Sequence, residues 1–279
     1  MVRCNWVRCN WVRRTAYFSA PLVLATALAT LPVRASDTWP GIHAEAFGGR
    51  TIQTGAGIVK LTTPYRPEDV RSVPMDAEIK LPAGQTIKAV SFVVDMNPSP
   101  VAAVFKMGEG RSSAHLATHI RLDQQSDVRV IVESNDGTLY MTEQLIKFAG
   151  GQASCSAPPL GDPAEIAASM GKMDFAGIGP KPNASHQTAR ARYALSHPNH
   201  TGMVLDPITL LYIPLLMVDR IEARQGDELV FEMTGSITVA QNPKVEFDYV
   251  TNGAAEMTLT ARDTSGAVWT RSFPIGPAG

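Results

Sequence analysis

A single cysteine lies in a stretch of small residues near the middle of the chain. The segment 150–161 reads GGQASCSAPPLG and contains Cys155. A thiol in such a place can pair in a disulfide, ligate a metal, act as an enzyme's nucleophile or carry a covalently bound group. The small residues beside it are Gly150, Gly151, Ser154 and Ser156.

The local sequence predicts an exposed thiol with an ordinary pKa. The charged residues nearest to Cys155 in the sequence are Lys147 and Asp162, and no large apolar residue adjoins the cysteine. A nucleophilic cysteine needs a cation, a histidine or a helix N-terminus close by. A thiol with a pKa of about 8.5 is only a few per cent thiolate at pH 7. We therefore expect a flexible arm whose thiol other proteins activate. A buried inert cysteine and an intermolecular disulfide are the alternatives.

The N-terminal residues 1–35 predict a cleavable signal peptide. Arginines precede the apolar run 16–33, and Val33 and Ala35 supply the small residues of a cleavage site. The apolar run is short and interrupted for a membrane span, although an uncleaved anchor helix is the alternative. We expect export to the periplasm and a mature chain that begins near Ser36. Cleavage would remove Cys4 and Cys9 and leave one thiol in an oxidising compartment, which is unusual.

Composition narrows the possible partners. The formal net charge is −1, and 44% of the residues are hydrophobic, which is ordinary for a soluble protein with packed cores. A balanced charge gives no reason to expect a nucleic acid or an anionic membrane surface as a partner.

Two sets of short strand-like segments predict an all-β fold. Val128, Val130 and Val132 recur with the period of two that is typical of a strand. The first set comprises IVKLTTP, AEIKL, IKAVSFVVDM, VAAVFKM, AHLATHIRL, DVRVIVES and LYMTEQLIKF. The second set comprises RARYALSH, LMVDRIEARQ, DELVFEMTG, KVEFDYVT, AEMTLTARD and AVWTRSFPI. Each set has the size of an immunoglobulin-like β-sandwich.

The interval 149–188 between the two sets shows no strand pattern. Asp162 is a candidate N-cap and Glu165 completes a capping box, so we expect a short helix from Pro163 to Met170 that stops at Gly171. The remainder has the composition of a linker. The sequence therefore predicts two immunoglobulin-like β-sandwich domains joined by a long linker with a short helix.

One apolar run does not fit a loop. Residues 208–216 read ITLLYIPLL, which is too short to span a bilayer. Pro214 argues against a central strand. Two interpretations stay open, and they are compatible: a buried strand of the second sandwich, or an apolar strip pressed against the first domain.

Several segments in order resemble a known carrier. IVKLTTP, NPSPVAAVFKM and THIRLDQQSDVRVIVESNDGTLYM, followed by a Gly-Gly tail with a cysteine, resemble the Y component of the SoxYZ sulfur carrier of thiosulfate oxidation over residues 58–155. SHPNHTGM, VDRIEARQGDELVFEMTGSITVAQNPKVEFDY and LTARDTSGAVW resemble its Z component over residues 190–275. The whole chain is similar to fused SoxYZ-like carriers, including those associated with quinoprotein dehydrogenases.

The resemblance implies domains and roles. It implies a SoxY-like sandwich with the cysteine arm over 36–157, a linker over 158–188 and a SoxZ-like sandwich over 189–279. Cys155 would hold sulfur intermediates covalently, and the flexible arm around it would consist of Gly150, Gly151, Ser154 and Ser156. The chain would be a carrier without cofactor rather than an enzyme. Its partners would be periplasmic sulfur-oxidation enzymes or cytochromes, or a quinoprotein dehydrogenase system. Unlike the family's terminal arm, this one is tethered at both ends.

Two other functions remain possible on the residues alone. A metal-binding module would use His115 and His119, four apart on a strand-like run, or His197 and His200. An exported adaptor would dock to a dehydrogenase with no covalent cargo. A catalytic function finds little support, because no Ser/His/Asp set, phosphate loop or metal-ligand array is present.

Overall fold

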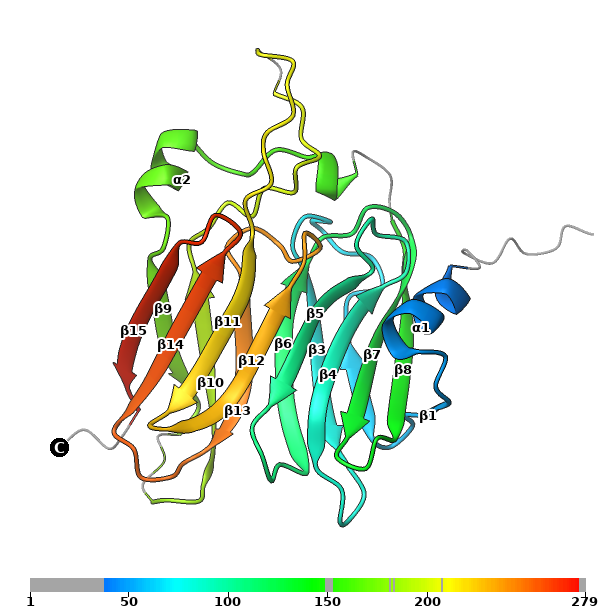
Figure 1. The fold of residues 1–279 in the computed structure, drawn as a ribbon, viewed down its shortest axis with the longest axis vertical. Coiled ribbons are helices and arrows are strands. Elements are labelled where there is room, and N and C mark those ends of the chain that lie inside the picture. Colours follow the sequence, from blue (N-terminus) through cyan, green and yellow to red (C-terminus); the bar gives the residue numbers. More distant parts are fainter. Residues whose placement is uncertain (1–37, 149–152, 181, 183, 207, 276–279) are drawn as a thin grey trace, which may run out of the picture. The chain divides into compact units, whose positions relative to one another are not determined.

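Two β-sheets pack face to face and carry the cysteine segment at one end (Figure 1). The computed structural model describes residues 38–148, 153–180, 182, 184–206 and 208–275. All of these belong to one structural unit, Arg34–Gly279. The expected signal peptide, 1–35, lies outside the described residues. Among the described residues, no helix has the length and hydropathy of a membrane-spanning segment.

The larger sheet has nine strands. Their spatial order is β1 (Ile52–Thr54), β8 (Leu139–Ile146), β7 (Ser126–Ser134), β4 (Ile87–Val94), β5 (Val101–Met107), β12 (Glu228–Gly235), β11 (Val218–Gln225), β14 (Glu256–Asp263) and β15 (Val268–Pro274). Strand β1 pairs in parallel with β8, and the other neighbours are antiparallel.

The smaller sheet has six strands. Their order is β2 (Val59–Thr62), β3 (Val73–Lys80), β6 (Ser113–Ile120), β13 (Lys244–Val250), β10 (Thr188–Leu195) and β9 (Met173–Ile178). The helical elements are α1 (Trp39–Phe47), the 3₁₀ turn η1 (Ser154–Ser156) and α2 (Pro163–Ser169). The expected all-β fold is confirmed.

Both sheets run without a break through the two halves of the chain. Strand β5 of the first half pairs with β12 of the second, so that Phe105 lies opposite Met233. Strand β6 pairs with β13 in the same way, with Leu116 opposite Phe247. The halves therefore share their backbone hydrogen-bond ladders, and neither half ends in a free edge at the junction.

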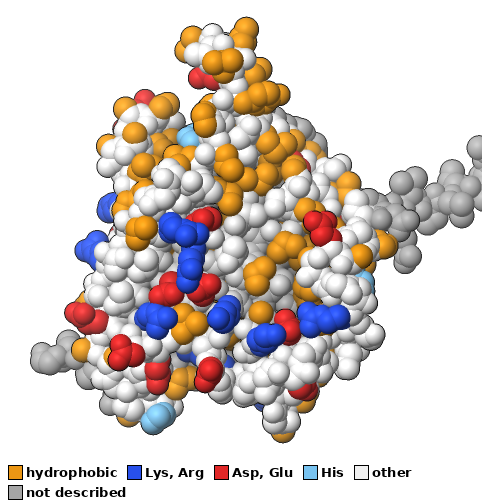
Figure 2. Space-filling model, in the orientation of Figure 1, with side chains coloured by type: hydrophobic (Ala, Val, Ile, Leu, Met, Phe, Trp, Pro, Cys, Tyr) orange, Lys and Arg blue, Asp and Glu red, His pale blue; other side chains and the backbone are white. Residues whose placement is uncertain are grey.

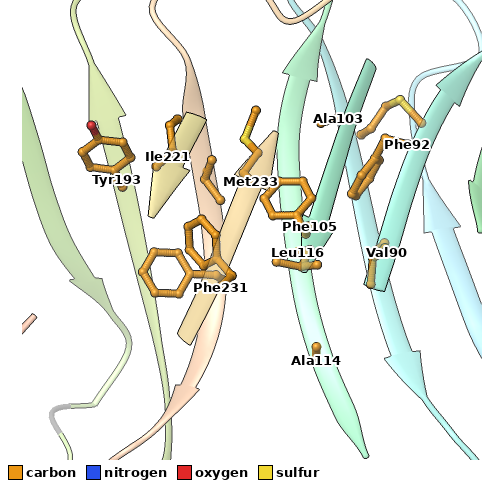
Figure 3. Packing of buried hydrophobic residues seen from close by; sticks show 14 of the residues in the cluster. Val90, Phe92, Ala103, Phe105, Ala114, Leu116, Tyr193, Ile221, Phe231 and Met233 are labelled. Atoms are coloured by element: carbon orange, nitrogen blue, oxygen red, sulfur yellow. The ribbon is translucent and has the colours of Figure 1, made fainter. Parts of the chain in front are cut away.

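The core also crosses the junction. Figure 3 shows Phe105 of the first half between Phe92 of the same half and Phe231 of the second. The ring centroids of Phe105 and Phe231 lie 5.6 Å apart in an edge-to-face arrangement, and Phe231 lies 4.9 Å from Phe247. All four phenylalanine side chains are fully buried. Edge-to-face aromatic pairs add to the free energy gained by burial alone, so this row of rings joins the two halves.

Helix α2 forms where the sequence predicts it. The Asp162 carboxylate accepts hydrogen bonds from the backbone N–H groups of Ala164 and Glu165 at 2.8 and 3.1 Å, as expected of an N-cap. The interval after it contains strand β9, which the sequence analysis missed. Strand β9 pairs only with β10 at the edge of its sheet, and most of its side chains are not buried. Such an edge strand carries little apolar pattern.

Helix α1 and strand β1 were also not predicted. Helix α1 contains Pro40 and Gly41 and has no side-chain cap, so its local sequence favours a helix only weakly. Ile42 and Phe47 are its buried residues, and they pack with Val93 and two further core residues. Tertiary contacts of this kind, rather than local propensity, stabilise the helix.

Both interpretations of the apolar run 208–216 are wrong. The run forms the tip and returning arm of a hairpin that projects beyond the ends of the sheets (Figure 1, yellow). Ile208 is 89% exposed and Leu210 is 70% exposed. The backbone of the hairpin pairs with itself, as shown by the bridges His200–Leu216 and Leu205–Tyr212. These bridges satisfy backbone hydrogen-bonding groups of the hairpin although it belongs to neither sheet. No local sequence signal distinguishes such a hairpin from a buried strand.

Candidate functional site around Cys155

Cys155 lies in the turn η1, after β8 and before α2. Cys155 is fully buried, and the neighbouring Ser154 is 1% exposed. The expectation of a solvent-exposed thiol is therefore wrong. Small neighbours made exposure plausible, but they equally allow close packing against segments from elsewhere in the chain. Gly150 and Gly151 of the expected arm lie outside the described residues, whereas Ser156 is half-buried at the end of η1.

Two side chains hold the backbone of the cysteine on opposite sides. The N–H of Cys155 donates to Oδ1 of Asp123 at 2.6 Å. The carbonyl oxygen of Cys155 accepts from the Thr201 hydroxyl at 2.5 Å. Asp123 belongs to the first half of the chain and Thr201 to the second half, and we call this pair the cysteine clamp. The described part of the expected arm, around Cys155, is thus held in place rather than free.

The segment after the cysteine is tied a second time. The N–H of Leu160 donates to Oε1 of Gln241 at 2.8 Å, and the Gln241 amide returns a hydrogen bond to the Leu160 carbonyl at 2.9 Å. Gln241 belongs to the second half of the chain. The turn that carries the thiol is thus fixed both at the cysteine and five residues later.

Asn97 positions the acidic side of the clamp. Its side-chain oxygen accepts from the N–H of Asp123 at 3.0 Å, and its amide donates to the carbonyl of Arg121 at 2.7 Å. Asn97 is 4% exposed. Because a buried amide with good partners keeps one orientation, it fixes the loop that follows β6 and sets the direction of the Asp123 carboxylate.

Arg121 links the same loop to the second half. Its guanidinium donates to the carbonyl oxygens of Ile237 and Asn199 at 3.0 and 2.8 Å, and also to that of Val239. The residue is 5% exposed, and no carboxylate of the described residues lies within ion-pair distance of it. Burial lowers the pKa of this guanidinium from its ordinary value. Arg121 is therefore a buried cation close to the thiol, held by neutral carbonyl groups.

The surroundings suppress the ionisation of the thiol. Burial, followed by the negative charge and hydrogen bonding of Asp123, raises the pKa of the Cys155 thiol to about 12. The Arg121 charge and a hydrogen bond with Ser154 act in the opposite direction but are outweighed. At pH 7 such a pKa leaves about one thiol in 10⁵ ionised. The thiol in this position is thus a poor nucleophile, contrary to the ordinary pKa that the sequence suggested.

Two of the four candidate metal-binding histidines have side-chain partners within the chain. His115 Nε2 lies 2.7 Å from Asp76 Oδ2, and His197 Nδ1 lies 2.9 Å from the side-chain oxygen of Asn199. Burial lowers the pKa of the imidazoles of His119, His197 and His200. Among the described residues no group of three or more His, Cys, Asp or Glu side chains is arranged to hold a metal ion.

Comparisons with known proteins match both halves of the chain. The family model for the sulfur oxidation protein SoxY matches residues 43–152, and the model for the sulphur oxidation protein SoxZ matches residues 178–274. Together the two matches cover most of the chain, in the order Y then Z. The chain is a fused SoxYZ-like protein. The junction at β5–β12 and β6–β13 thus joins a SoxY domain to a SoxZ domain within one polypeptide.

Solved structures resemble the chain more distantly. The sulfur carrier protein SoxY from Chlorobium limicola f thiosulfatophilum is 20% identical, with a TM-score of 0.34, and the match covers 40% of this chain and 91% of that one. A β-glycosidase from Bacteroides vulgatus is 9% identical, with a TM-score of 0.21, and the match covers 78% of this chain and 24% of the glycosidase. The comparison with curated proteins gave no match. The family assignment rests on the two family models.

The SoxY match ends just before the candidate site. Its last residue is Gln152, and Cys155 follows three residues later. Sequence reasoning found the cysteine but missed Asp123, Thr201 and Arg121, which set its environment. The only sequence signal for these was their place in the segments THIRLDQQ and SHPNHTGM, which resemble the family without identifying a role.

Proposed function

We propose that this fused SoxYZ-like protein is a periplasmic carrier that holds sulfur intermediates covalently on Cys155 and presents them to partner enzymes. The SoxY and SoxZ family matches support a carrier role in sulfur oxidation. Cys155 is the free cysteine of the described residues, and it lies three residues after the end of the SoxY match. The observation that carries the proposal is the position of this thiol, held between side chains of the two domains.

The buried thiol implies two positions of the segment. In the held position Cys155 is fully buried, so no partner can reach its sulfur. Loading therefore requires the clamp to open and the segment to leave the surface. The hydrogen bond to the Asp123 carboxylate contributes about 1.5–3 kcal/mol to the held position, and the bond from Thr201 about 0.5–1.5 kcal/mol. These amounts are small enough for contact with a partner to offset.

Electron balance restricts the partner that loads the carrier. When the Cys155 thiolate and thiosulfate join through a new S–S bond, the product is a protein-bound S-thiosulfonate anion, and two electrons are released. The loading partner must therefore accept two electrons, as a redox protein such as a cytochrome does in successive one-electron steps. The carrier itself supplies the thiolate, while the partner supplies the oxidant. We accordingly propose a carrier rather than an enzyme.

Fusion of the two domains keeps the clamp complete. Linking two partners on one chain replaces their bimolecular association with an effective concentration on the order of millimolar. Thr201 of the SoxZ domain then remains beside the cysteine at any dilution in the periplasm. The expected signal peptide, 1–35, and export to that compartment belong to the proposal.

The cysteine itself tests the function. We compare host strains that produce the wild-type chain, the Cys155→Ser variant or the Ser156→Ala variant, with thiosulfate as the sulfur compound. The carrier function predicts that Cys155→Ser abolishes thiosulfate consumption, whereas Ser156→Ala retains it. If Cys155→Ser consumes thiosulfate at the wild-type rate, the protein is an adaptor with no covalent cargo.

A further inference from the structure

A projecting hairpin begins at the clamp and presents apolar side chains to solvent. Its described residues are 200–206 and 208–216, and we call it the apolar hairpin. Half of the exposed large hydrophobic side chains in the described residues lie on it, and Figure 2 shows them gathered on the projection, with charged side chains on the sheet surface below. These side chains are Leu205, Ile208, Leu210, Leu211, Tyr212 and Leu215. Clusters of exposed apolar residues on a soluble protein commonly mark interaction sites.

The tip of the apolar hairpin is ordered by its own hydrogen bonds. The Asp206 carboxylate accepts from the N–H groups of Ile208 and Thr209, both at 2.8 Å. The N–H of Leu210 donates to the Asp206 carbonyl at 2.9 Å, and the N–H of Asp206 donates to the carbonyl of Leu211 at the same distance. The apolar side chains therefore project from a defined turn, which lowers the entropy lost when they dock.

Leu210 occupies a backbone conformation that leucine disfavours. Its φ is +57°, in the left-handed region that suits glycine and asparagine. The side chain is 70% exposed, so no core packing in the described structure offsets the strain. Backbone strain at an exposed position is typical of functional sites. Binding of the Leu210 side chain to an apolar surface of another molecule would be such a function.

The root of the apolar hairpin touches the cysteine segment. Thr201, which donates to the Cys155 carbonyl, follows His200, the residue that pairs with Leu216 to close the hairpin. A protein that reaches the sulfur of Cys155 approaches this end of the sandwich and meets the hairpin. Thr201, one of the two clamp residues, thus lies at the root of the hairpin that such a protein would meet.

The charges favour a protein pocket over a lipid surface. Residues 200–216 contain no Lys or Arg, and Asp206 is the acidic residue among them. Binding to anionic lipids relies on basic residues, which the hairpin lacks. An uncharged, apolar pocket on a protein can bind the hairpin without them. A second copy of the chain is disfavoured because pairing through the hairpins would cover the end at which a partner must reach the thiol.

We propose that the tip of the apolar hairpin inserts into an uncharged, apolar pocket on the protein that reacts with Cys155. This inference rests on the proposed carrier function. Docking at the tip brings the partner to the thiol end and displaces Thr201, so that the cysteine segment is released where it is needed.

The test uses Leu210→Asn, with Val250→Asn as the matched control. Asparagine removes the apolar side chain and tolerates the left-handed backbone, so the variant keeps or raises the melting temperature. Val250 is 39% exposed and pairs with Thr188, at the end of its strand away from the cysteine. Each full chain is produced in a thiosulfate-grown host, and the fraction of Cys155 that carries an adduct is measured by intact mass spectrometry.

The inference predicts that Leu210→Asn lowers the loaded fraction about tenfold, since an apolar contact of one buried leucine is lost, while Val250→Asn loads as the wild type does. The purified Leu210→Asn protein should react with iodoacetamide at the wild-type rate, because the clamp is intact. Equal loading of Leu210→Asn and wild type would overturn the inference and leave the carrier function standing. A wild type that is never loaded would overturn the carrier function itself.

Two further measurements test whether the apolar hairpin binds a second copy of the chain or a lipid bilayer instead. Sedimentation of the purified wild type at micromolar concentration detects a dimer, and co-sedimentation with phosphatidylcholine vesicles detects membrane binding. If the hairpin binds a protein pocket, the purified wild type should be a monomer and should not co-sediment with the vesicles. A dimer that Leu210→Asn dissociates, or vesicle binding that it abolishes, would assign the hairpin to that occupant and overturn the inference.

Discussion

The hydroxyl of Thr201 donates a hydrogen bond of 2.5 Å to the carbonyl oxygen of Cys155. The two residues are 46 positions apart in the chain. The bond ties the segment that carries the thiol, which follows the SoxY match, to a residue of the SoxZ domain.

Loss of the Thr201 hydroxyl should expose the thiol. Thr201→Val keeps the volume of the side chain but leaves the Cys155 carbonyl without its donor. We expect iodoacetamide to alkylate Cys155 about twofold to tenfold faster, as the loss of one neutral hydrogen bond implies. Thr209→Val, the same replacement at the tip of the apolar hairpin, should react at the wild-type rate. Unchanged alkylation in Thr201→Val would remove this residue from the clamp.

Replacement of Asp123 should separate its charge from its hydrogen bond. Asp123→Asn retains an oxygen that accepts from the Cys155 N–H but removes the negative charge that helps raise the pKa of the thiol. We expect the thiol pKa, followed by thiolate absorbance against pH, to fall in Asp123→Asn yet stay above its ordinary value, because burial persists. Asp123→Ala also loses the acceptor and should expose the thiol. An unaltered titration in both variants would contradict the clamp.

High pH should weaken the fold through Cys155. The thiol pKa is raised in the folded state, so the unfolded chain loses this proton near pH 8.5–9 while the folded chain keeps it up to about pH 12. Stability from this group is fully present below that window and is lost as the pH rises through it. The wild type should lose up to about 1.4 kcal/mol per pH unit relative to Cys155→Ala. The free energy of unfolding of both proteins is measured with denaturant from pH 8 to 11. If the wild type and Cys155→Ala changed in parallel, the thiol would ionise without opening the fold.

The shared core should make the two domains unfold together. Phe231 of the SoxZ domain packs against Phe105 of the SoxY domain across the continuous sheet. Phe231→Ala should cost about 3–5 kcal/mol, as is typical of a buried phenylalanine. Calorimetry should show one transition in both the wild type and the variant. Two separate transitions, with only one of them shifted, would mean that the domains unfold independently.

Local patterns in the sequence predicted most of the strands. The alternation at Val128, Val130 and Val132 marks β7, and Asp162 marks the start of α2. These features are encoded within a few neighbouring residues, since side chains on a strand alternate between its faces and a cap acts within one turn. Strand β9 and helix α1 lack such patterns and depend on contacts with the sheets.

The environment of Cys155 could not be read from its neighbours. Asp123 lies 32 positions before it and Thr201 lies 46 positions after it, and both reach the cysteine only because β6 and β13 pair across the domains. The exposed tip at Leu210 could not be read either, because an apolar run predicts burial whether a partner or the chain itself provides it. The sequence therefore singled out Cys155, while its accessibility was predicted wrongly.

The mass of the native protein tests the carrier claim most directly. Intact mass spectrometry of the protein from thiosulfate-grown cells should show Cys155 bearing sulfur or thiosulfonate additions that a reductant removes. Cys155→Ser from the same culture should carry none. An unmodified Cys155 thiol under conditions in which the host oxidises thiosulfate would contradict the proposed function.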